Sequence, residues 1–445
     1  MMRSTRFVVL LVVVAIVGVI VSLATWCFLE ALYQIQRELY THLPHALGYA
    51  NGPPKWWPLP ILAIGAVIVA FAIDHLPGDG GHVPADGLAV GGSPRPDFLP
   101  GVMLAGLATI GSGLVLGPEA PLIALGSGLG ALLIGLGRRE TPPQVLMVVA
   151  AAGSFAAVSF IFSSPLIAAV ILIEAAALGG ARMRVVLVPG LLAAGIGTLV
   201  SIGIGSFTGL STSAYALGPL PLSAAPRPTA AAFGWTIGLA IAIALVTSVV
   251  MRGGGLTHGF VARRLLPLLP VIALIIGGLA IAFTQITGHG VSQVLFSGQD
   301  QLPGLVSQAG SWSLAALAWL LLFKGLAYSL SLGAYRGGPT FPAIFLGAAA
   351  GLMCSHLPGF PIQASVAVGM GAALVAVLRL PLSAVVVATL LTVHASDRVE
   401  PLIIVGVVVA YVVTLLVGKR PASAPAPPPA PAAAAPPRTA ASAGG

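Results

Sequence analysis

Charge is what this sequence lacks most. Only 7% of its 445 residues are charged, while 57% are hydrophobic. A soluble domain usually carries about a quarter charged residues, so this composition excludes an ordinary water-exposed surface. Acidic residues are the scarcer kind, with 12 Asp and Glu against 20 Lys and Arg. The composition is typical of a chain whose helices are solvated by lipid.

Cysteine and catalytic signatures are scarce as well. The two cysteines, Cys27 and Cys354, lie in apolar runs, which excludes a disulfide framework or a cysteine-based metal site. The chain has no HExxH pattern, no Gly-x-Ser-x-Gly elbow and no paired intramembrane acids, so we expect no enzyme, cofactor or metal. The net charge of +8 comes mostly from basic residues in short breaks between apolar runs. This pattern is typical of topology-setting charge rather than of a nucleic-acid partner.

Long apolar runs are what the sequence has instead. The first, residues 7–26, is uncharged and longer than the ~7–15 residues of a signal-peptide core, so we favour a retained helix over a signal peptide. The remaining runs are roughly 57–76, 98–116, 119–136, 144–161, 165–178, 185–205, 230–251, 267–286, 312–333, 340–353, 362–378, 382–394 and 401–417. Several are interrupted by Gly or Pro, and irregular backbone is tolerated in a membrane only where it is buried or lines a cavity.

These runs predict an all-α polytopic membrane protein whose transmembrane domain covers residues 1–420. Residues 421–445 are rich in Pro and Ala and cannot build a core, so we expect a disordered tail and no soluble domain after the last helix.

Two stretches of the sequence repeat one another. Residues 117–126 read GPEAPLIALG and residues 338–347 read GPTFPAIFLG, an offset of 221 positions, and the Pro-Leu pairs at 165 and 381 match at an offset of 216. The alternative is chance similarity in a Gly/Pro-rich chain. A duplicated unit is favoured because the order of residues repeats as well as their composition. It predicts two halves at roughly 57–205 and 230–417. Matched broken segments in two halves often mark the binding site of a transporter.

Only two acids, Glu119 and Glu174, lie well inside apolar sequence. A charged side chain there costs ~2.5–3.5 kcal/mol on insertion scales, so such residues usually face a cavity and act in function. Pro121 suits a first helical turn, which places Glu119 at a helix N-terminus, where free N–H groups and the helix dipole favour an anion. A tethered carboxylate can occupy that site itself, and its protonation would release it. The alternative is a helix-terminal charge with no transport role.

The ordered set of motifs resembles the CLC family of chloride channels and chloride/proton exchangers, over about residues 7–417. Its Gly-Ser-Gly-Ile-Pro loop is similar to residues 80–84, its loop with the gating glutamate to residues 117–121, and its Gly-x-Phe-x-Pro loop to residues 338–342. The resemblance implies a divergent prokaryotic-type member without CBS domains, an inverted repeat of broken and tilted helices, and a homodimer in the inner membrane with one pore per subunit. It also implies a gate at Glu119 and these anion-binding residues: Gly80, Gly81, His82, Val83, Gly117, Glu119, Ala120, Gly338, Thr340 and Phe341.

The chain departs from the family pattern at several ligand positions. The serine of the first loop is Gly81, the basic residue before the gating glutamate is Pro118, and Thr340 stands where the third loop has phenylalanine. The family's tyrosine ligand would fall near Ser423. A hydroxyl of Thr340 or the ring of His82 could supply a replacement donor, although His82 can equally be a loop residue in water.

The position of the family's internal proton glutamate is Ala175, which cannot relay protons. The sequence therefore predicts channel-like, glutamate-gated chloride transport, related to that of voltage-gated chloride channels. The alternatives are a chloride/proton antiporter or a proton-linked carrier of another anion such as fluoride or nitrate. Glu174 is expected to be structural, and the cations Lys324 and Arg379 are expected to pair or to reach the membrane surface.

Overall fold

The structure is a computed structural model that describes residues 5–50, 52–88, 95–137, 142–176, 180–208, 217–262, 265–395 and 398–418. Among these residues the secondary structure is helical apart from one isolated bridge. Nine of the described helices are long and apolar enough to cross a membrane. The predicted all-α polytopic membrane fold is therefore confirmed. The expected tail, residues 421–445, lies outside the described residues.

Helices of the first half of the chain follow the predicted apolar runs closely. The first helix is longer than its apolar run and continues through a π-helical turn, Glu38–His42. The helices are α1 (Thr5–Arg37), α2 (Leu43–Ala46), α3 (Pro58–His75), α4 (Leu99–Ser112), α5 (Glu119–Gly137), α6 (Pro143–Phe162), α7 (Pro165–Ala175) and α8 (Gly180–Thr208).

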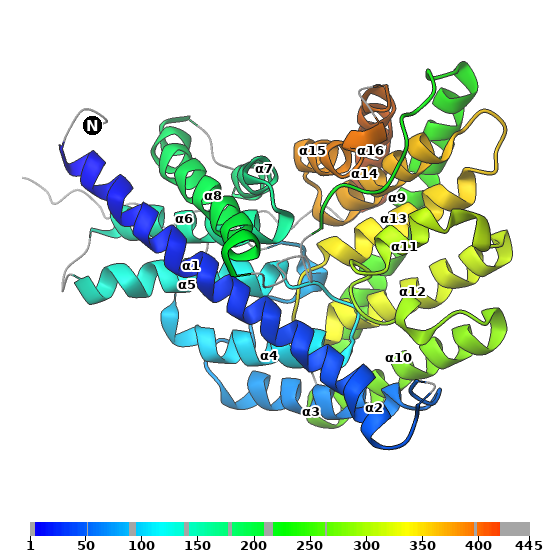
Figure 1. The fold of residues 1–445 in the computed structure, drawn as a ribbon, viewed down its shortest axis with the longest axis horizontal. Coiled ribbons are helices and arrows are strands. Elements are labelled where there is room, and N and C mark those ends of the chain that lie inside the picture. Colours follow the sequence, from blue (N-terminus) through cyan, green and yellow to red (C-terminus); the bar gives the residue numbers. More distant parts are fainter. Residues whose placement is uncertain are drawn as a thin grey trace, which may run out of the picture.

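The second half repeats this alternation of long and short helices. Its helices are α9 (Ala230–Val261), α10 (Leu265–Thr287), α11 (Leu302–Ser307), α12 (Leu314–Ala334), α13 (Thr340–Cys354), α14 (Ile362–Leu378), α15 (Pro381–Leu391) and α16 (Glu400–Val417). Figure 1 shows α5–α8 on one side of the molecule and α13–α16 on the other, with α1 lying across the first group and α7 beside α15.

Two helix pairs, α5 with α6 and α13 with α14, pack in the same way. A Cβ atom at Gly126 of α5 would meet the backbone of Gly153 in α6, and one at Gly347 of α13 would meet the backbone of Gly369 in α14. Glycine at these positions permits the close approach of two helix backbones. The residues of the two pairs are separated by 221 and 216 positions, the offsets of the sequence repeat.

The ends of α6 and α14 are equivalent as well. Each helix ends at a residue in the left-handed conformation, Ser163 with φ 47° and Arg379 with φ 58°, and each is followed by a short helix that begins at a proline. A left-handed residue stops a helix and turns the chain, and proline suits a first helical turn. The two halves therefore break their helices at matching places.

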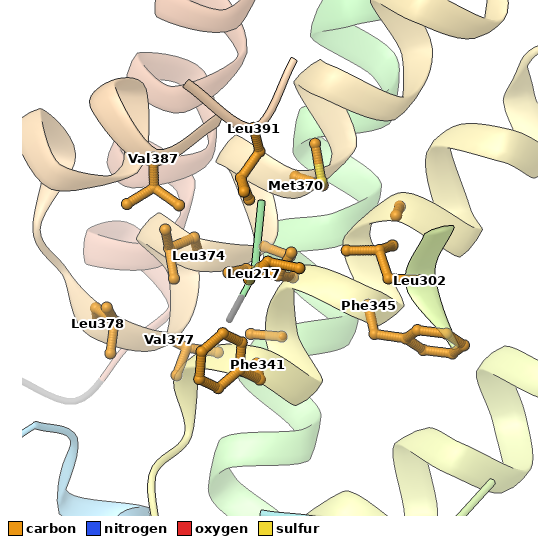
Figure 2. Close-up of a cluster of buried hydrophobic side chains, with 14 of the residues drawn as sticks. Leu217, Leu302, Phe341, Phe345, Met370, Leu374, Val377, Leu378, Val387 and Leu391 are labelled. Carbon is orange, nitrogen blue, oxygen red and sulfur yellow. The ribbon is translucent and has the colours of Figure 1, made fainter. Parts of the chain in front are cut away.

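A continuous apolar core surrounds these breaks. Figure 2 shows the part of it around the N-terminal half of α13, where Phe341 lies beside Val377 of α14 and Phe345 points to the other side, toward Leu302. Leu217 and Leu302 complete this cluster from outside those helices. The first residues of α13 are thus held by packed side chains.

Candidate functional site

The two repeated breaks pair with one another at the centre of the molecule. The backbone N–H of Gly117 donates to the carbonyl of Gly338 at 2.8 Å, and the N–H of Gly338 donates to the carbonyl of Gly117 at 2.6 Å. Helix α5 begins two residues after Gly117, at Glu119, and α13 begins two residues after Gly338, at Thr340. This short antiparallel bridge brings the N-termini of the two helices to the same place.

The carboxylate of Glu119 lies at the N-terminus of the other helix. Its Oε1 atom accepts a hydrogen bond from the backbone N–H of Thr340, and the Thr340 hydroxyl and the Phe341 N–H also interact with it. The Glu119 residue is only 2% exposed, and Oε2 has no hydrogen-bond partner in the part of the chain that the structure describes. Free N–H groups and the helix dipole make such a terminus a site for an anion. The glutamate therefore occupies an anion position that α13 provides.

Glycine is required on both sides of this carboxylate. A Cβ atom at Gly338 would overlap the Glu119 carboxyl group, and one at Gly117 would overlap the same group from the opposite break. On its apolar side, Phe341 stacks on Phe162 with ring centroids 5.3 Å apart. Among the described residues, the carboxylate is thus enclosed by backbone, by the Thr340 hydroxyl and by aromatic side chains.

Hydrogen bonds from distant elements fix the segment that leads to Glu119. The Tyr40 hydroxyl, from the π-helical turn, donates to the carbonyl of Ser112 at 2.7 Å, and the N–H of Phe296 donates to the carbonyl of Gly113 at 2.8 Å. The N–H of Val115 donates to the Ser331 hydroxyl at 3.2 Å. Buried backbone polar groups need partners, so these bonds allow an irregular backbone at this depth.

The matching segment before Thr340 has an aromatic partner. Tyr328 of α12 is buried, and its hydroxyl donates to the carbonyl of Pro339 at 2.6 Å. This tyrosine is close enough to Glu119 to interact with its charge. The resemblance pointed to a tyrosine position near Ser423, which is outside the described residues, whereas Tyr328 reaches the site from within the bundle.

The first predicted loop, residues 80–84, lies apart from the carboxylate. It leads into a single 3-10 turn, Pro84–Asp86, rather than into a long helix, and Gly80 and Gly81 have φ values of 68° and 102°. The His82 side chain is exposed, and its Nε2 atom lies 3.0 Å from the carbonyl of Gly87 in its own loop. No hydrogen bond among the described residues joins this loop to Glu119.

His82 adds no positive charge at neutral pH. Although His82 is exposed at the surface, desolvation of its ring by the surrounding loop is the main cause that lowers its pKa below the usual value. The nearby Arg336 lowers the pKa further, while the Gly87 carbonyl and Asp86 act in the opposite direction. A lowered pKa leaves the imidazole neutral at pH 7.

Two other residues that were predicted to bind the anion lie at helix starts. Val83 directly precedes the 3-10 turn, and Ala120 follows Glu119 in the first turn of α5.

Arg336 is a residue that sequence reasoning missed. It lies just before the second break, is only 7% exposed, and its Nε atom donates to the carbonyl of Asp79 at 3.0 Å. Arg336 lies in a break between two long apolar runs, where a cation is not in itself a sign of a buried site. The sequence signal that could have found it is a cation directly before the glycines of a repeated motif.

Lys324 behaves differently from the expectation. It is fully buried in α12 and pairs with no carboxylate among the described residues. Its ammonium group donates to the backbone carbonyls of residues 293–296 at 3.0–3.2 Å and lies 4.6 Å from the centroid of the Phe345 ring. Carbonyl oxygens and an aromatic face both favour a cation. Lys324 therefore connects residues 293–296 to α12 and, through Phe345, to α13.

Glu174 caps the short helix α15. Its carboxylate accepts hydrogen bonds from the N–H groups of Leu382 and Ser383 at 3.0 and 2.7 Å and from the Ser383 hydroxyl at 2.6 Å. An acid that receives the first N–H groups of a helix stabilises that helix terminus. The contact also joins α7 to its sequence counterpart α15.

Two broken helices whose N-termini meet at one buried carboxylate are typical of a membrane protein that binds a small anion. A family model described as "Voltage gated chloride channel" matches residues 87–415. The chain belongs to the voltage-gated chloride channel family, whose members transport anions.

Proteins of known sequence and structure agree with this assignment. The chain is 30% identical over 367 residues to "Putative ion-transport protein YfeO" of Escherichia coli O1:K1 / APEC, which covers 79% of this chain and 80% of that protein. It is also similar in fold to a slow cyanobacterial Cl−/H+ antiporter, with a TM-score of 0.72, 20% identity, and coverage of 93% and 95% of the two chains. A CLC-type fluoride/proton antiporter matches with a TM-score of 0.69, 16% identity, and coverage of 93% and 97%. The chain is therefore an integral membrane protein with bacterial relatives, as expected for an inner-membrane protein.

Replacing Gly338 with alanine tests the enclosure of the carboxylate. The added methyl group would overlap the Glu119 carboxyl group and force it away from the Thr340 N–H, so we expect chloride flux into liposomes to lose most of its pH dependence. Gly310→Ala is the matched control, because a Cβ atom there meets nothing within 4 Å. A wild-type pH profile in Gly338→Ala would contradict the described position of Glu119.

Proposed function

We propose that this protein conducts chloride across the membrane, in a channel-like manner, with Glu119 as the gate. The observation that carries the proposal is the contact of the buried Glu119 carboxylate with the N-terminus of α13. A carboxylate and a halide ion are both anions that helix N–H groups bind. They therefore compete for the same position.

Protonation supplies a way to open this gate. A neutral carboxyl group no longer interacts with the dipole of α13 as an anion does, so it can leave the site to chloride. The N–H groups of Thr340 and Phe341 and the Thr340 hydroxyl are then available as donors. The Thr340 hydroxyl stands where the family has phenylalanine, and it compensates for the backbone donor that Pro339 removes.

Channel-like conduction is favoured over exchange by the absence of a second proton-carrying acid. Glu119 is the one acidic residue that is fully buried in the part of the chain that the structure describes. Ala175 stands where exchangers have their internal glutamate, and the neighbouring Glu174 already caps α15. A proton that reaches Glu119 would therefore find no second buried acid among the described residues to carry it onward.

Proton-coupled antiport is the second candidate. Both solved structures named above are described as antiporters, one for chloride and one for fluoride. The chloride/proton exchanger and a fluoride/proton exchanger are therefore the alternatives that any transport measurement has to include. We propose a homodimer as the working assembly and no catalytic chemistry.

Replacing Glu119 with glutamine tests the gate. Glutamine keeps the size of the side chain but removes the charge that competes with chloride, so flux should become nearly independent of pH and exceed wild-type flux at neutral pH. The measurement is chloride efflux from liposomes at a series of pH values. Glu174→Gln is the matched control, since it removes the other acid in an apolar helix and should leave the pH profile unchanged. Equal pH dependence in Glu119→Gln and the wild type would refute the gate.

Crossed gradients of chloride and protons separate the two transport modes. For a channel, the zero-current voltage follows the chloride gradient alone, because no proton movement contributes to the current. For an antiporter, the same voltage shifts when only the pH gradient is changed. We expect no such shift in purified, reconstituted protein, and a reproducible shift would favour the antiporter.

A further inference from the structure

We infer that Arg336 binds the anion on its way to Glu119 and is the side chain that selects anions in this pathway. The inference rests on the proposed function, since it names a second contact of the same transported ion. It concerns a residue that lies outside the three loops that resemble the family's motifs.

Arg336 lies between the first loop and the second break. Its Nε atom donates to the carbonyl of Asp79, and a Cβ atom at Gly80 would come within 3.3 Å of its Cγ atom. Its own backbone N–H is 3.5 Å from the Thr109 hydroxyl of α4. Two residues further along the chain, a Cβ atom at Gly338 would overlap the Glu119 carboxyl group. Arg336 therefore joins the first loop to the break that encloses the Glu119 carboxylate.

The partners of this guanidinium do not neutralise it. Nε and Nη1 donate to the backbone carbonyls of Asp79 and Tyr335, which carry no net charge. No described carboxylate lies within ion-pair distance of it. The Asp79 carboxylate interacts with Arg336 at longer range, but this side chain is exposed and screened by water. A guanidinium is protonated at any physiological pH.

A buried positive charge without a counter-ion is costly unless an anion accompanies it. The chain on either side of Arg336 and of its partner Asp79 carries glycine at residues 80, 81, 337 and 338. Glycine lets a ligand approach the backbone closely. This combination suits a small monovalent anion such as chloride.

A role of Arg336 in anion binding and a purely structural role predict different outcomes for substitutions at this position. Arg336→Gln removes the charge, and we expect the chloride concentration for half-maximal flux to rise about tenfold, as for the loss of one charge-assisted contact. Arg336→Lys keeps the charge and should recover most of this apparent affinity. If Arg336 only fastened residue 79 to the second break, lysine would fail as glutamine does, and both would change maximal flux rather than apparent affinity.

The measurement is chloride-dependent flux in liposomes together with thermal stability of the purified variants in detergent. Arg95→Gln is the matched control, because it removes an exposed cation from the connection between α3 and α4, which also contains the first loop. Unchanged apparent affinity in Arg336→Gln would overturn the inference, and so would an effect that lysine fails to rescue. Either result would leave the gate proposal intact, provided that the pH dependence set by Glu119 persists. If the wild-type protein showed no chloride flux at all, the proposed function itself would be overturned.

Discussion

The contact between the Glu119 carboxylate and the N-terminus of α13 is the interaction on which the site depends. In a bilayer, every buried polar group must find its partner inside the protein. The structure meets this requirement by pairing the backbones of Gly117 and Gly338, so that each break satisfies the other. The same pairing brings a negative side chain from one half to the positive end of a helix from the other half. Backbone satisfaction and anion recognition thus come from one arrangement.

The two halves share their packing but not their chemistry. The glycine contacts of α5 with α6 recur in α13 with α14, and the left-handed ends at Ser163 and Arg379 recur at the same offset. At the centre, however, Glu119 faces Thr340, its counterpart in the repeat. A second glutamate there would place two like charges in one buried site, which is unfavourable. One half therefore supplies the titratable group, and the other supplies neutral donors.

Much of this arrangement could be predicted from the sequence. The apolar runs gave the helix positions to within a few residues for most helices, because length and hydropathy dominate in lipid. The repeat around residues 117–126 and 338–347 indicated which segments meet, and the proline at 121 placed Glu119 at a helix start. What could not be predicted were long-range partners such as Tyr40, Ser331 and Arg336, since no local pattern records a contact between residues far apart in the chain. The exposed position of His82 also depends on how its loop turns back on Gly87.

The most direct test of the central claim is to observe where an anion binds when the carboxylate is removed. Crystals of Glu119→Ala grown with bromide should show an anomalous scattering peak within hydrogen-bonding distance of the Thr340 and Phe341 N–H groups, in the space that the carboxylate occupies. Wild-type crystals at neutral pH should show no peak there. A peak in both proteins, or in neither, would contradict the view that Glu119 and the transported anion compete for the N-terminus of α13.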